Sequence, residues 1–306
     1  MLAKHIISTL ANYEAERGIP LSAFEIYKYL HKTSEEKISF SQILSELKNV
    51  SEENKNIKHK NGFYFLNSEE DKYKERIERE KQSIKKWKKA RKIIYFMQAI
   101  PFVKSIAISG SLSMNNVTKK SDIDIFMITK AGRIWTARTL SMLFTQLIGK
   151  RRHDAKIDDK ICLNYFASEG GQTGTKNLAS ANIFLRTIPV FGVKEYEKFF
   201  NENAYWIIKY FQNAKPATAK KREIKESVVL KAIKKLFEFL LAGKLGDIFE
   251  KSLSSWQKKR IERKIKNEKN VSNLIYTDDI LMLHWPNPRN EEVMRRYESI
   301  IKSIFL

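Results

Sequence analysis

Two short apolar segments separated by a polar stretch, within residues 105–129, constrain the fold of this chain more than any other feature. The first segment, Ile106–Ile108, runs into Ser109-Gly110-Ser111, and the second, Ile125–Ile128, directly follows Asp122-Ile123-Asp124. Apolar runs of this kind predict buried β-strands. A glycine between a strand and a helical turn lets backbone amides approach a phosphate, and the start of a helix adds partial positive charge. The pattern therefore predicts a phosphate-binding turn between two strands.

Asp122 and Asp124 stand two residues apart at the start of the second strand, so their side chains project from the same face. Two carboxylates that point the same way repel each other, and a divalent cation between them removes the repulsion. Mg²⁺ (or Mn²⁺) is held by one or two carboxylates while substrate phosphates complete its shell. With the turn at Gly110 and Ser111, the pair predicts metal-assisted phosphoryl or nucleotidyl transfer.

This arrangement resembles the DNA polymerase β-like nucleotidyltransferase superfamily, which carries an apolar strand, Gly-Ser, a spacer, and Asp-apolar-Asp entering a second strand. Gly110, Ser111, Asp122 and Asp124 match that motif residue by residue, over about 104–130 and more loosely to 167. The resemblance implies an NTP substrate whose monophosphate moves to an acceptor hydroxyl with release of pyrophosphate. It implies that Gly110 and Ser111 hold the β- and γ-phosphates, and that Asp122 and Asp124 bind Mg²⁺ and carry the catalysis.

One position departs from the superfamily pattern, in which a third strand bears a third acidic residue. Here the third strand is expected at 160–166, and the nearest residue is Asn164, which we place on the acceptor side of the site. An amide oxygen can ligate a metal but adds no charge and takes no proton. Three interpretations stay open: two carboxylates suffice with one tightly held metal, Asp158 or Asp159 supplies the third ligand, or the domain binds nucleotides without catalysis. Strand alternation also places Cys162, Asn164 and Phe166 on one face.

The charge of the chain indicates its partners. Lys and Arg number 57 against 35 Asp and Glu, a formal net charge of +22, which favours polyanions. The basic residues gather at 72–92, 150–152 and 258–266, and this predicts an RNA or DNA acceptor. A single cysteine excludes an intrachain disulfide and indicates a reducing, cytoplasmic compartment. The apolar runs are too short to span a bilayer, and we expect no membrane partner.

The chain divides into four parts that together predict an α+β protein. Residues 1–68 read as three short helices and an Asn61-Gly62 hairpin, a winged-helix-like module; 69–103 read as a long basic linker helix. Residues 104–178 form the nucleotidyltransferase-type mixed sheet with helices, and 179–306 a helical C-terminal domain. Within the last part, the apolar residues of 228–241 recur at helical spacing among lysines. We interpret this helix as core-facing, with attachment to a membrane surface as the alternative.

A competing function follows from the same features. The protein could be a winged-helix nucleic-acid-binding protein whose transferase domain binds nucleotides with weak or no catalysis. Transfer to a small molecule or a protein side chain also fits the motif, but leaves the positive charge unexplained. Arg133 and Arg138 could reach a triphosphate, although arginines on a helix surface usually form local ion pairs.

Overall fold

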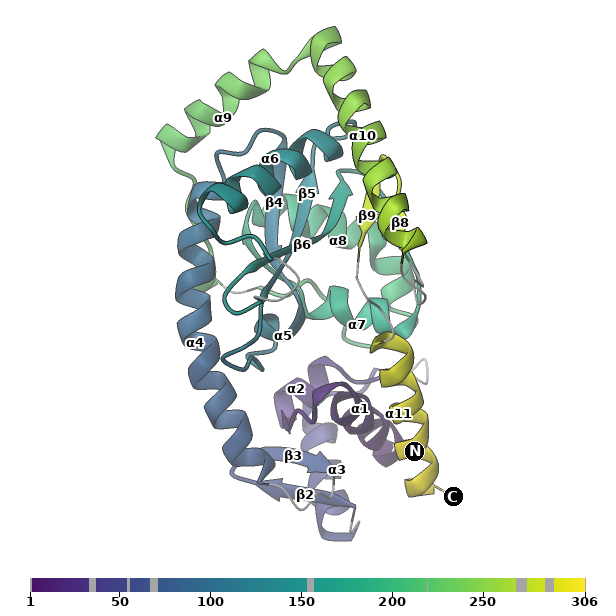
Figure 1. Cartoon of the computed structure of the whole chain (residues 1–306). Coiled ribbons are helices and arrows are strands. Elements are labelled where there is room, and N and C mark those ends of the chain that lie inside the picture. The colour runs from purple at the N-terminus through teal and green to yellow at the C-terminus, as the bar shows by residue number, and fades with distance from the viewer. Residues whose placement is uncertain are drawn as a thin grey trace.

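A six-stranded mixed sheet forms the centre of the molecule, and a small antiparallel sheet lies at one end (Figure 1). The computed structural model describes residues 2–32, 37–53, 56–66, 71–152, 157–218, 220–267, 274–283 and 289–305. Within these ranges the chain forms eleven α-helices together with the two sheets, which makes it an α+β protein.

The large sheet has the strand order β7-β4-β5-β6-β9-β8. Its strands are β4 (Val103–Ile108), β5 (Ile123–Thr129), β6 (Ile161–Ser168), β7 (Ile188–Phe191), β8 (Ile275–Tyr276) and β9 (Ile280–Met282). Only β5 and β6 pair in parallel, and every other neighbouring pair in this sheet is antiparallel. The four-residue helix α5 (Gly110–Ser113) follows β4 directly, as the glycine at this junction predicts.

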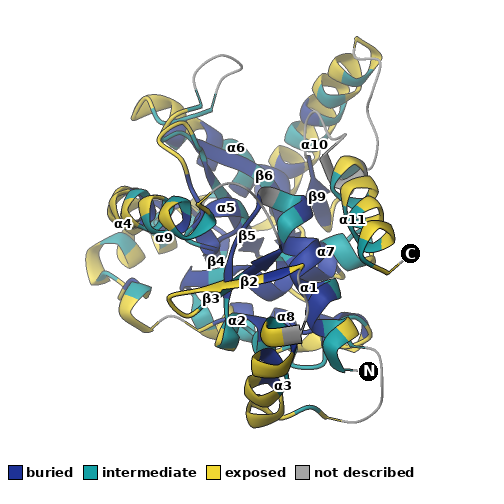
Figure 2. Ribbon diagram, turned by 90° about the horizontal axis from the view of Figure 1, so that it is seen from below, coloured by how far each residue is buried: buried dark blue, intermediate teal, exposed yellow. Residues whose placement is uncertain are grey.

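Each face of the large sheet packs into its own apolar cluster, because successive residues of a strand point to opposite faces. Ile123, Ile125 and Met127 of β5 face a cluster that includes Trp87 and Trp135. The helices on this side are α4 (Lys72–Met97), α6 (Ile134–Leu147) and α10 (Gly243–Lys266). Those on the other side are α7 (Leu178–Arg186) and α8 (Val193–Ile207). Figure 2 shows β4, β5, β6 and β9 of this sheet mostly in the buried class.

The N-terminal part contains the elements expected from its sequence. They are α1 (Leu2–Arg17), β1 (Leu21–Ser22), α2 (Ala23–Lys28), α3 (Phe40–Glu53), β2 (Ile57–Lys60) and β3 (Phe63–Leu66). The hairpin between β2 and β3 is confirmed, with Asn61 at φ 50° and Gly62 at φ 82° in the turn. At the start of α3, Ser39 and Gln42 exchange backbone-to-side-chain hydrogen bonds of 2.8 and 3.3 Å, a capping box.

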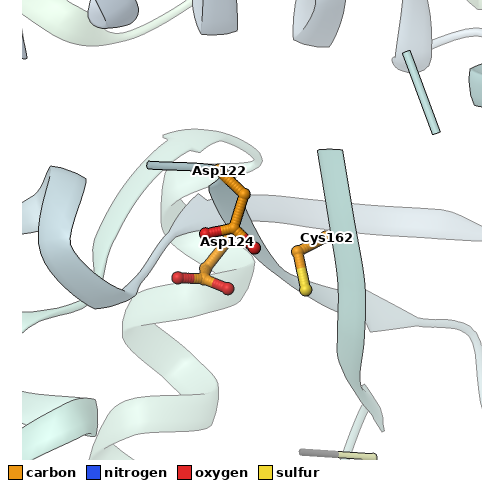
Figure 3. A group of neighbouring side chains, drawn as sticks. All are labelled: Asp122, Asp124 and Cys162. Atoms are coloured by element: carbon orange, nitrogen blue, oxygen red, sulfur yellow. The ribbon is translucent and has the colours of Figure 1, made fainter. Parts of the chain in front are cut away.

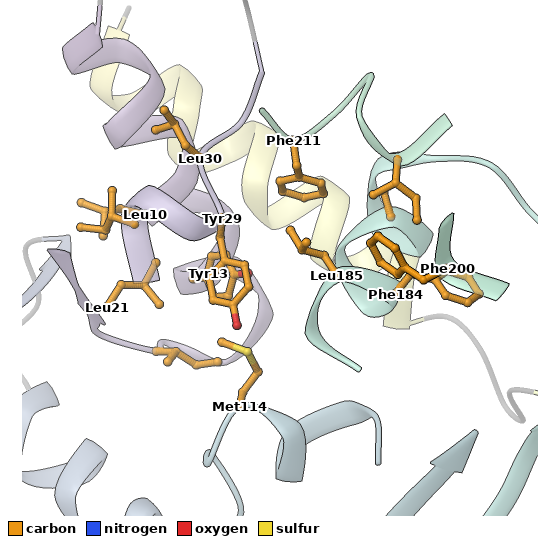
Figure 4. Packing of buried hydrophobic residues seen from close by; sticks show 14 of the residues in the cluster. Leu10, Tyr13, Leu21, Tyr29, Leu30, Met114, Phe184, Leu185, Phe200 and Phe211 are labelled. Atoms are coloured by element: carbon orange, nitrogen blue, oxygen red, sulfur yellow. The ribbon is translucent and has the colours of Figure 1, made fainter. Parts of the chain in front are cut away.

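This N-terminal part shares its core with the rest of the molecule. The apolar cluster on the α7 side runs without interruption from Leu10 and Tyr13 to Phe184 and Phe211 (Figure 4). Tyr13 Oη donates to Asn182 Oδ1 at 2.9 Å across this contact. The C-terminal helix α11 (Arg289–Phe305) returns to pack beside α1 (Figure 1). The two ends of the chain therefore meet on the same module.

The long helix predicted within 69–103 is present as α4, which runs beside both sheets (Figure 1). Its basic residues are not all on the surface: Arg76 and Lys86 are buried, and Arg76 Nη2 donates to Glu25 Oε1 at 2.8 Å. Ile77, Ile84 and Trp87 form an apolar stripe in the sequence that predicts a packed side of this helix, but Ile84 is exposed, whereas Trp87 is buried. The exposed cations of α4 lie mostly in its second half.

The range 179–306 differs from the expected helical domain. This range contributes three strands, β7, β8 and β9, to the large sheet. Its helices are α7, α8, α9 (Val228–Leu240), α10 and α11, together with the 3₁₀ turn η1 (Lys220–Arg222). The prediction that 228–241 is a core-facing helix is wrong, because none of the residues of α9 is buried. No helix in the described part of the chain is long and apolar enough to cross a bilayer.

Candidate functional site

Asp122 and Asp124 lie side by side at the beginning of β5, as the strand period predicts. Asp122 directly precedes the strand, and Asp124 pairs in register with Cys162 on the parallel neighbour β6. One potential ligand atom from each of the three residues lies within 4.8 Å of the others. Figure 3 shows the three side chains next to one another. Both carboxylates are partly exposed, whereas Cys162 is buried. Within the described ranges, this is the only group of three or more His, Cys, Asp or Glu residues that could hold a metal ion.

Gly110 lies directly against this pair. Its φ is +62°, in the left-handed region that L side chains rarely adopt, and a Cβ built on it would stand 2.2 Å from Asp124 Oδ2. The preceding Ser109 N donates to the Asp124 carbonyl at 3.0 Å, which ties the end of β4 to the start of β5. Only glycine fits here, since both the backbone conformation and the space exclude a side chain.

Ser111 follows in α5 and is buried. Its carbonyl accepts a hydrogen bond of 2.9 Å from Asn116 N, so the segment after α5 folds back over the turn. Ser113 Oγ donates to the Gly110 carbonyl at 2.8 Å. The structure thus brings together Gly110, Ser111 and both aspartates, although they are separated in sequence by the spacer 112–121.

The third position of the group belongs to Cys162 rather than to Asn164. Between the pairs Asp124–Cys162 and Phe126–Tyr165, β6 contains one residue more than β5, a β-bulge. The prediction that Cys162, Asn164 and Phe166 share one face is wrong, because beyond the bulge Phe166 packs with the cluster on the opposite side. Asn164 lies in the bulge, and its carbonyl accepts from Leu283 N at 2.8 Å.

Arg152 supplies a positive charge to the same site. Its Nη1 lies 2.6 Å from Asp122 Oδ2 and 3.4 Å from Cys162 Sγ. Burial raises the pKa of the Cys162 thiol well above its usual value, and the nearby Asp124 and Asp122 carboxylates raise it further, with Arg152 opposing them. The thiol is therefore neutral at pH 7. A cation that takes both oxygens of Asp122 must first displace the guanidinium.

Asp159 does not join the carboxylate pair. Lys86 Nζ donates to Asp159 Oδ1 at 2.8 Å, and Lys89 contacts the other carboxylate oxygen. Partial burial opposes ionisation, but these hydrogen bonds outweigh it and hold the pKa of Asp159 below its usual value. Lys86 also donates to the Ser121 carbonyl at 2.7 Å, directly before Asp122. Asp159 and Lys86 therefore fix the loop that leads into the site, and Asp158 is also outside the ligand group.

The two arginines considered for a triphosphate make local contacts instead. Arg133 Nη2 lies 2.6 Å from Asp247 Oδ1, and Arg138 is bonded to Gln257 on α10. Burial, with Arg151 and Arg260 nearby, lowers the pKa of Arg138 to about 10. Both arginines join α6 to α10 and do not extend toward Asp122.

The positions of Cys162 and Arg152 beside the aspartates were not predicted from the sequence. Parallel pairing of the strand at 160–166 with the strand after Asp122 would have placed Cys162 beside Asp124. Arg152 stood out only as one of three consecutive cations. The sequence carries no local pattern that predicts the contact between the Arg152 side chain and Asp122.

No protein-family model matches the chain, and neither the search of curated proteins nor that of solved structures found a match.

Proposed function

We propose that this protein transfers a nucleoside monophosphate from an NTP to an acceptor hydroxyl on RNA or DNA, with a divalent metal. The observation that carries the proposal is the contact of Gly110 with Asp124 beside Asp122. It joins a side-chain-free turn, suited to phosphate, to a pair of carboxylates, suited to a cation. Metal-dependent phosphoryl chemistry needs these two elements at one place.

The arrangement of strands supports the resemblance to DNA polymerase β-like nucleotidyltransferases. β4 leads into the glycine turn, β5 begins at the aspartates, and β6 runs in parallel beside β5. We interpret this sheet, with α5 and α6, as a nucleotidyltransferase-type core. We interpret 1–68 as a winged-helix-like module, because three helices and a three-stranded antiparallel sheet occur there in the expected order.

The donor set fits a hard divalent cation through its carboxylates. Asp122 and Asp124 would hold Mg²⁺ or Mn²⁺, whereas Cys162 is a neutral thiol, and the thiolate rather than the thiol ligates metals. When bound, the metal neutralises charge on the triphosphate and polarises the α-phosphorus. This favours the interpretation in which two carboxylates and one metal suffice. Asp159 is engaged by lysines and does not serve as the third ligand.

The remaining roles fall to groups of the chain. The backbone of Gly110 and Ser111 would bind the β- and γ-phosphates, and Asn164 would line the acceptor side. Arg152, released from Asp122, would approach the phosphates, since a planar guanidinium binds phosphate oxygens well. The acceptor oxygen forms a bond to the α-phosphorus while the bond to the β-phosphate oxygen breaks. Pyrophosphate and the hydroxyl proton leave.

The exposed cations of α4 support a nucleic-acid acceptor. Their number and spacing along the helix beyond Glu80 suit a phosphate backbone; they are Lys81, Lys85, Lys88, Lys89, Arg91 and Lys92. No acidic residue of α4 lies beyond Glu80. A surface of one sign along a helix attracts a polyanion and makes binding strongly dependent on salt.

Label transfer tests this proposal. The protein is incubated with each α-labelled NTP, Mg²⁺ or Mn²⁺, and total RNA. Asp122→Asn and Asp124→Asn should each abolish transfer to RNA, while Asp158→Asn, an exposed neighbour outside the ligand group, should retain it. Absence of transfer by the wild-type protein with every NTP and both metals would contradict the proposal.

One observation favours the second candidate, a nucleic-acid-binding protein that holds nucleotides without turnover. The Arg152 guanidinium lies 2.6 Å from Asp122 Oδ2, where it neutralises a carboxylate that catalysis would assign to the metal. For this candidate, RNA binding persists in Asp122→Asn and Asp124→Asn and no labelled product forms with any NTP. The same experiment therefore separates the two functions.

A further inference from the structure

The amphipathic helix α9 turns its apolar residues toward solvent. Their exposed fractions run from 39% for Ile233 to 83% for Val228, and none of the thirteen residues of the helix is buried. The exposed apolar side chains are Val228, Val229, Ile233, Leu236, Phe237, Phe239 and Leu240. With 3.6 residues per turn, these positions cover about half of the helix circumference. The apolar half of this helix therefore has no protein surface over it within the described residues.

Polar contacts hold the other side of α9 to the molecule. Glu238 Oε1 accepts from Phe102 N at 2.8 Å, and Lys234 Nζ donates to the Val103 carbonyl. At the N-terminal end, Ser227 N donates to Gln98 Oε1 at 2.8 Å. Lys234 and Glu238 are one turn apart, so they define the side that faces the large sheet. A core-facing helix has the opposite arrangement, with apolar residues inward.

The exposed apolar surface continues onto the first turns of α10. Leu245, Ile248 and Phe249 are exposed there, Leu245 to 78%. In Figure 1, α9 and α10 meet in an elbow at the top of the molecule, at the end away from the small sheet. In this view α9 and the first turns of α10 protrude from the rest of the molecule.

Lysines accompany these apolar residues. Lys231 and Lys235 lie along one edge of the apolar half of α9, and Lys244 and Lys251 are exposed on α10. Two copies packed through this face would bring these cations together on chains that each carry +22. An anionic lipid surface instead offers both an apolar layer and opposite charge. Helices with Leu and Phe on one side and lysines beside them lie in the plane of such a surface.

We propose that the α9–α10 elbow binds to the surface of membranes that contain anionic lipids. The apolar half of α9 enters the boundary between headgroups and acyl chains, and Lys231 and Lys235 contact the headgroups. The protein attaches without crossing the bilayer, in agreement with the absence of a spanning helix among the described residues. This revises the expectation of no membrane partner, which considered the length of the apolar runs and took 228–241 as a core-facing helix. The proposal does not depend on nucleotidyl transfer.

Vesicle co-sedimentation of the full chain tests the proposal. The wild-type protein should sediment with vesicles of phosphatidylglycerol and phosphatidylcholine, and remain in solution with phosphatidylcholine alone. The double variant Phe237→Glu, Phe239→Glu should lower partitioning into the anionic vesicles by about tenfold or more, because both rings enter the interface. Lys231→Gln with Lys235→Gln should weaken it and make it less dependent on salt.

The matched control is the double variant Phe24→Glu, Phe40→Glu, which places the same two charges on exposed rings of α2 and α3, away from the elbow. It should sediment like the wild type. Lack of binding to anionic vesicles, or equal binding by the double variant, would overturn the proposal. So would a dimer, seen by analytical ultracentrifugation, that the double variant dissociates, since the elbow would then bind a second copy.

Discussion

Gly110 and the carboxylate of Asp124 lie so close that no Cβ fits between them: one built on Gly110 stands 2.2 Å from Asp124 Oδ2. The glycine belongs to the turn after β4, and the aspartate to the start of β5. Because the hydrogen bond from Ser109 N to the Asp124 carbonyl fixes the same two segments, the turn and the carboxylate form one rigid unit. A phosphate held by the turn and a cation held by the aspartate would be adjacent.

Gly110→Ala should therefore remove function and stability together. Alanine at positive φ costs about 1–2 kcal/mol, and the contact with Asp124 adds to this, so we expect a loss of about 2–4 kcal/mol. Gly132→Ala is the matched control, because Gly132 has φ +68° and nothing within 4 Å of its Cβ position. Urea unfolding and label transfer are measured on both. Equal losses in the two variants would show that the contact with Asp124 carries no energy.

Sequence reasoning located the aspartate pair and the glycine turn because both follow local rules. The strand period of two placed the carboxylates together, and a glycine after an apolar strand indicated the turn. The Asn61-Gly62 hairpin and the long helix α4 were also predicted from local chemistry. In each case the deciding interactions lie within a short stretch of chain.

The missed features depend on partners far apart in sequence. A bulge in β6 moves Phe166 to the opposite face, and no periodicity reveals an inserted residue. The strands β7, β8 and β9 have only four, two and three residues, too few for a period to show. For α9, the spacing predicts an apolar half, but which half faces the sheet is decided by Lys234 and Glu238 binding backbone groups near β4.

Cys162→Asp should increase the response of the protein to metal. A carboxylate at this position gives the cation a third hard ligand, and tenfold tighter binding adds about 1.4 kcal/mol of stabilisation at saturating metal. Without metal the variant should be less stable than the wild type, because a third carboxylate joins two others. Thermal unfolding is followed during a Mn²⁺ titration, with Cys162→Ser as the control of similar size. If both variants respond alike, Cys162 does not lie at the metal position.

Arg152→Gln should strengthen binding of the metal alone. The guanidinium contacts Asp122 at 2.6 Å, so a cation competes with it for the same oxygen. Removing the competitor should lower the dissociation constant for Mn²⁺ by about tenfold, equivalent to about 1.4 kcal/mol. Isothermal titration calorimetry without nucleotide measures this. Arg151→Gln is the control, since Arg151 contacts Met142 rather than the aspartates; an equal gain there would indicate a general effect of charge.

The exposed cations of α4 should control the salt dependence of RNA binding. The triple variant Lys85→Gln, Lys88→Gln, Lys92→Gln removes three phosphate contacts, which should lower the slope of log K against log salt by about 2 for a single strand. Fluorescence polarisation with a labelled single-stranded RNA at several salt concentrations gives the slope. Substituting Lys194, Lys198 and Lys209 in the same way removes equal charge from exposed positions on and after α8. An equal change in this control would place RNA elsewhere.

His31 lies where the N-terminal module meets the C-terminal helix. Its Nδ1 is 3.0 Å from Ser8 Oγ, and its ring packs edge-on against Phe211 at 5.5 Å between centroids. The ring of Tyr297 on α11 lies 6.3 Å from the His31 ring, measured between centroids. Burial lowers the pKa of His31 to about 4, and the nearby His5 contributes in the same direction. The folded protein therefore keeps this ring neutral.

Stability should decline as the pH falls from 6.5 to about 4 because of His31. In this window the unfolded chain binds a proton at His31 and the folded protein does not, so the free energy of unfolding decreases with falling pH. The full effect is about 3 kcal/mol, and above pH 6.5 it disappears because His31 is neutral in both states. Urea unfolding of the wild type and of His31→Gln at pH 7.5 and pH 4.5 measures it, since glutamine does not titrate and the remaining groups are common to both proteins. The variant should lose about 2.5 kcal/mol less than the wild type between the two pH values, whatever its stability at pH 7.5, because pH 4.5 is still above the folded pKa. An equal loss in both would mean that His31 accepts a proton in the folded state as readily as in the unfolded chain.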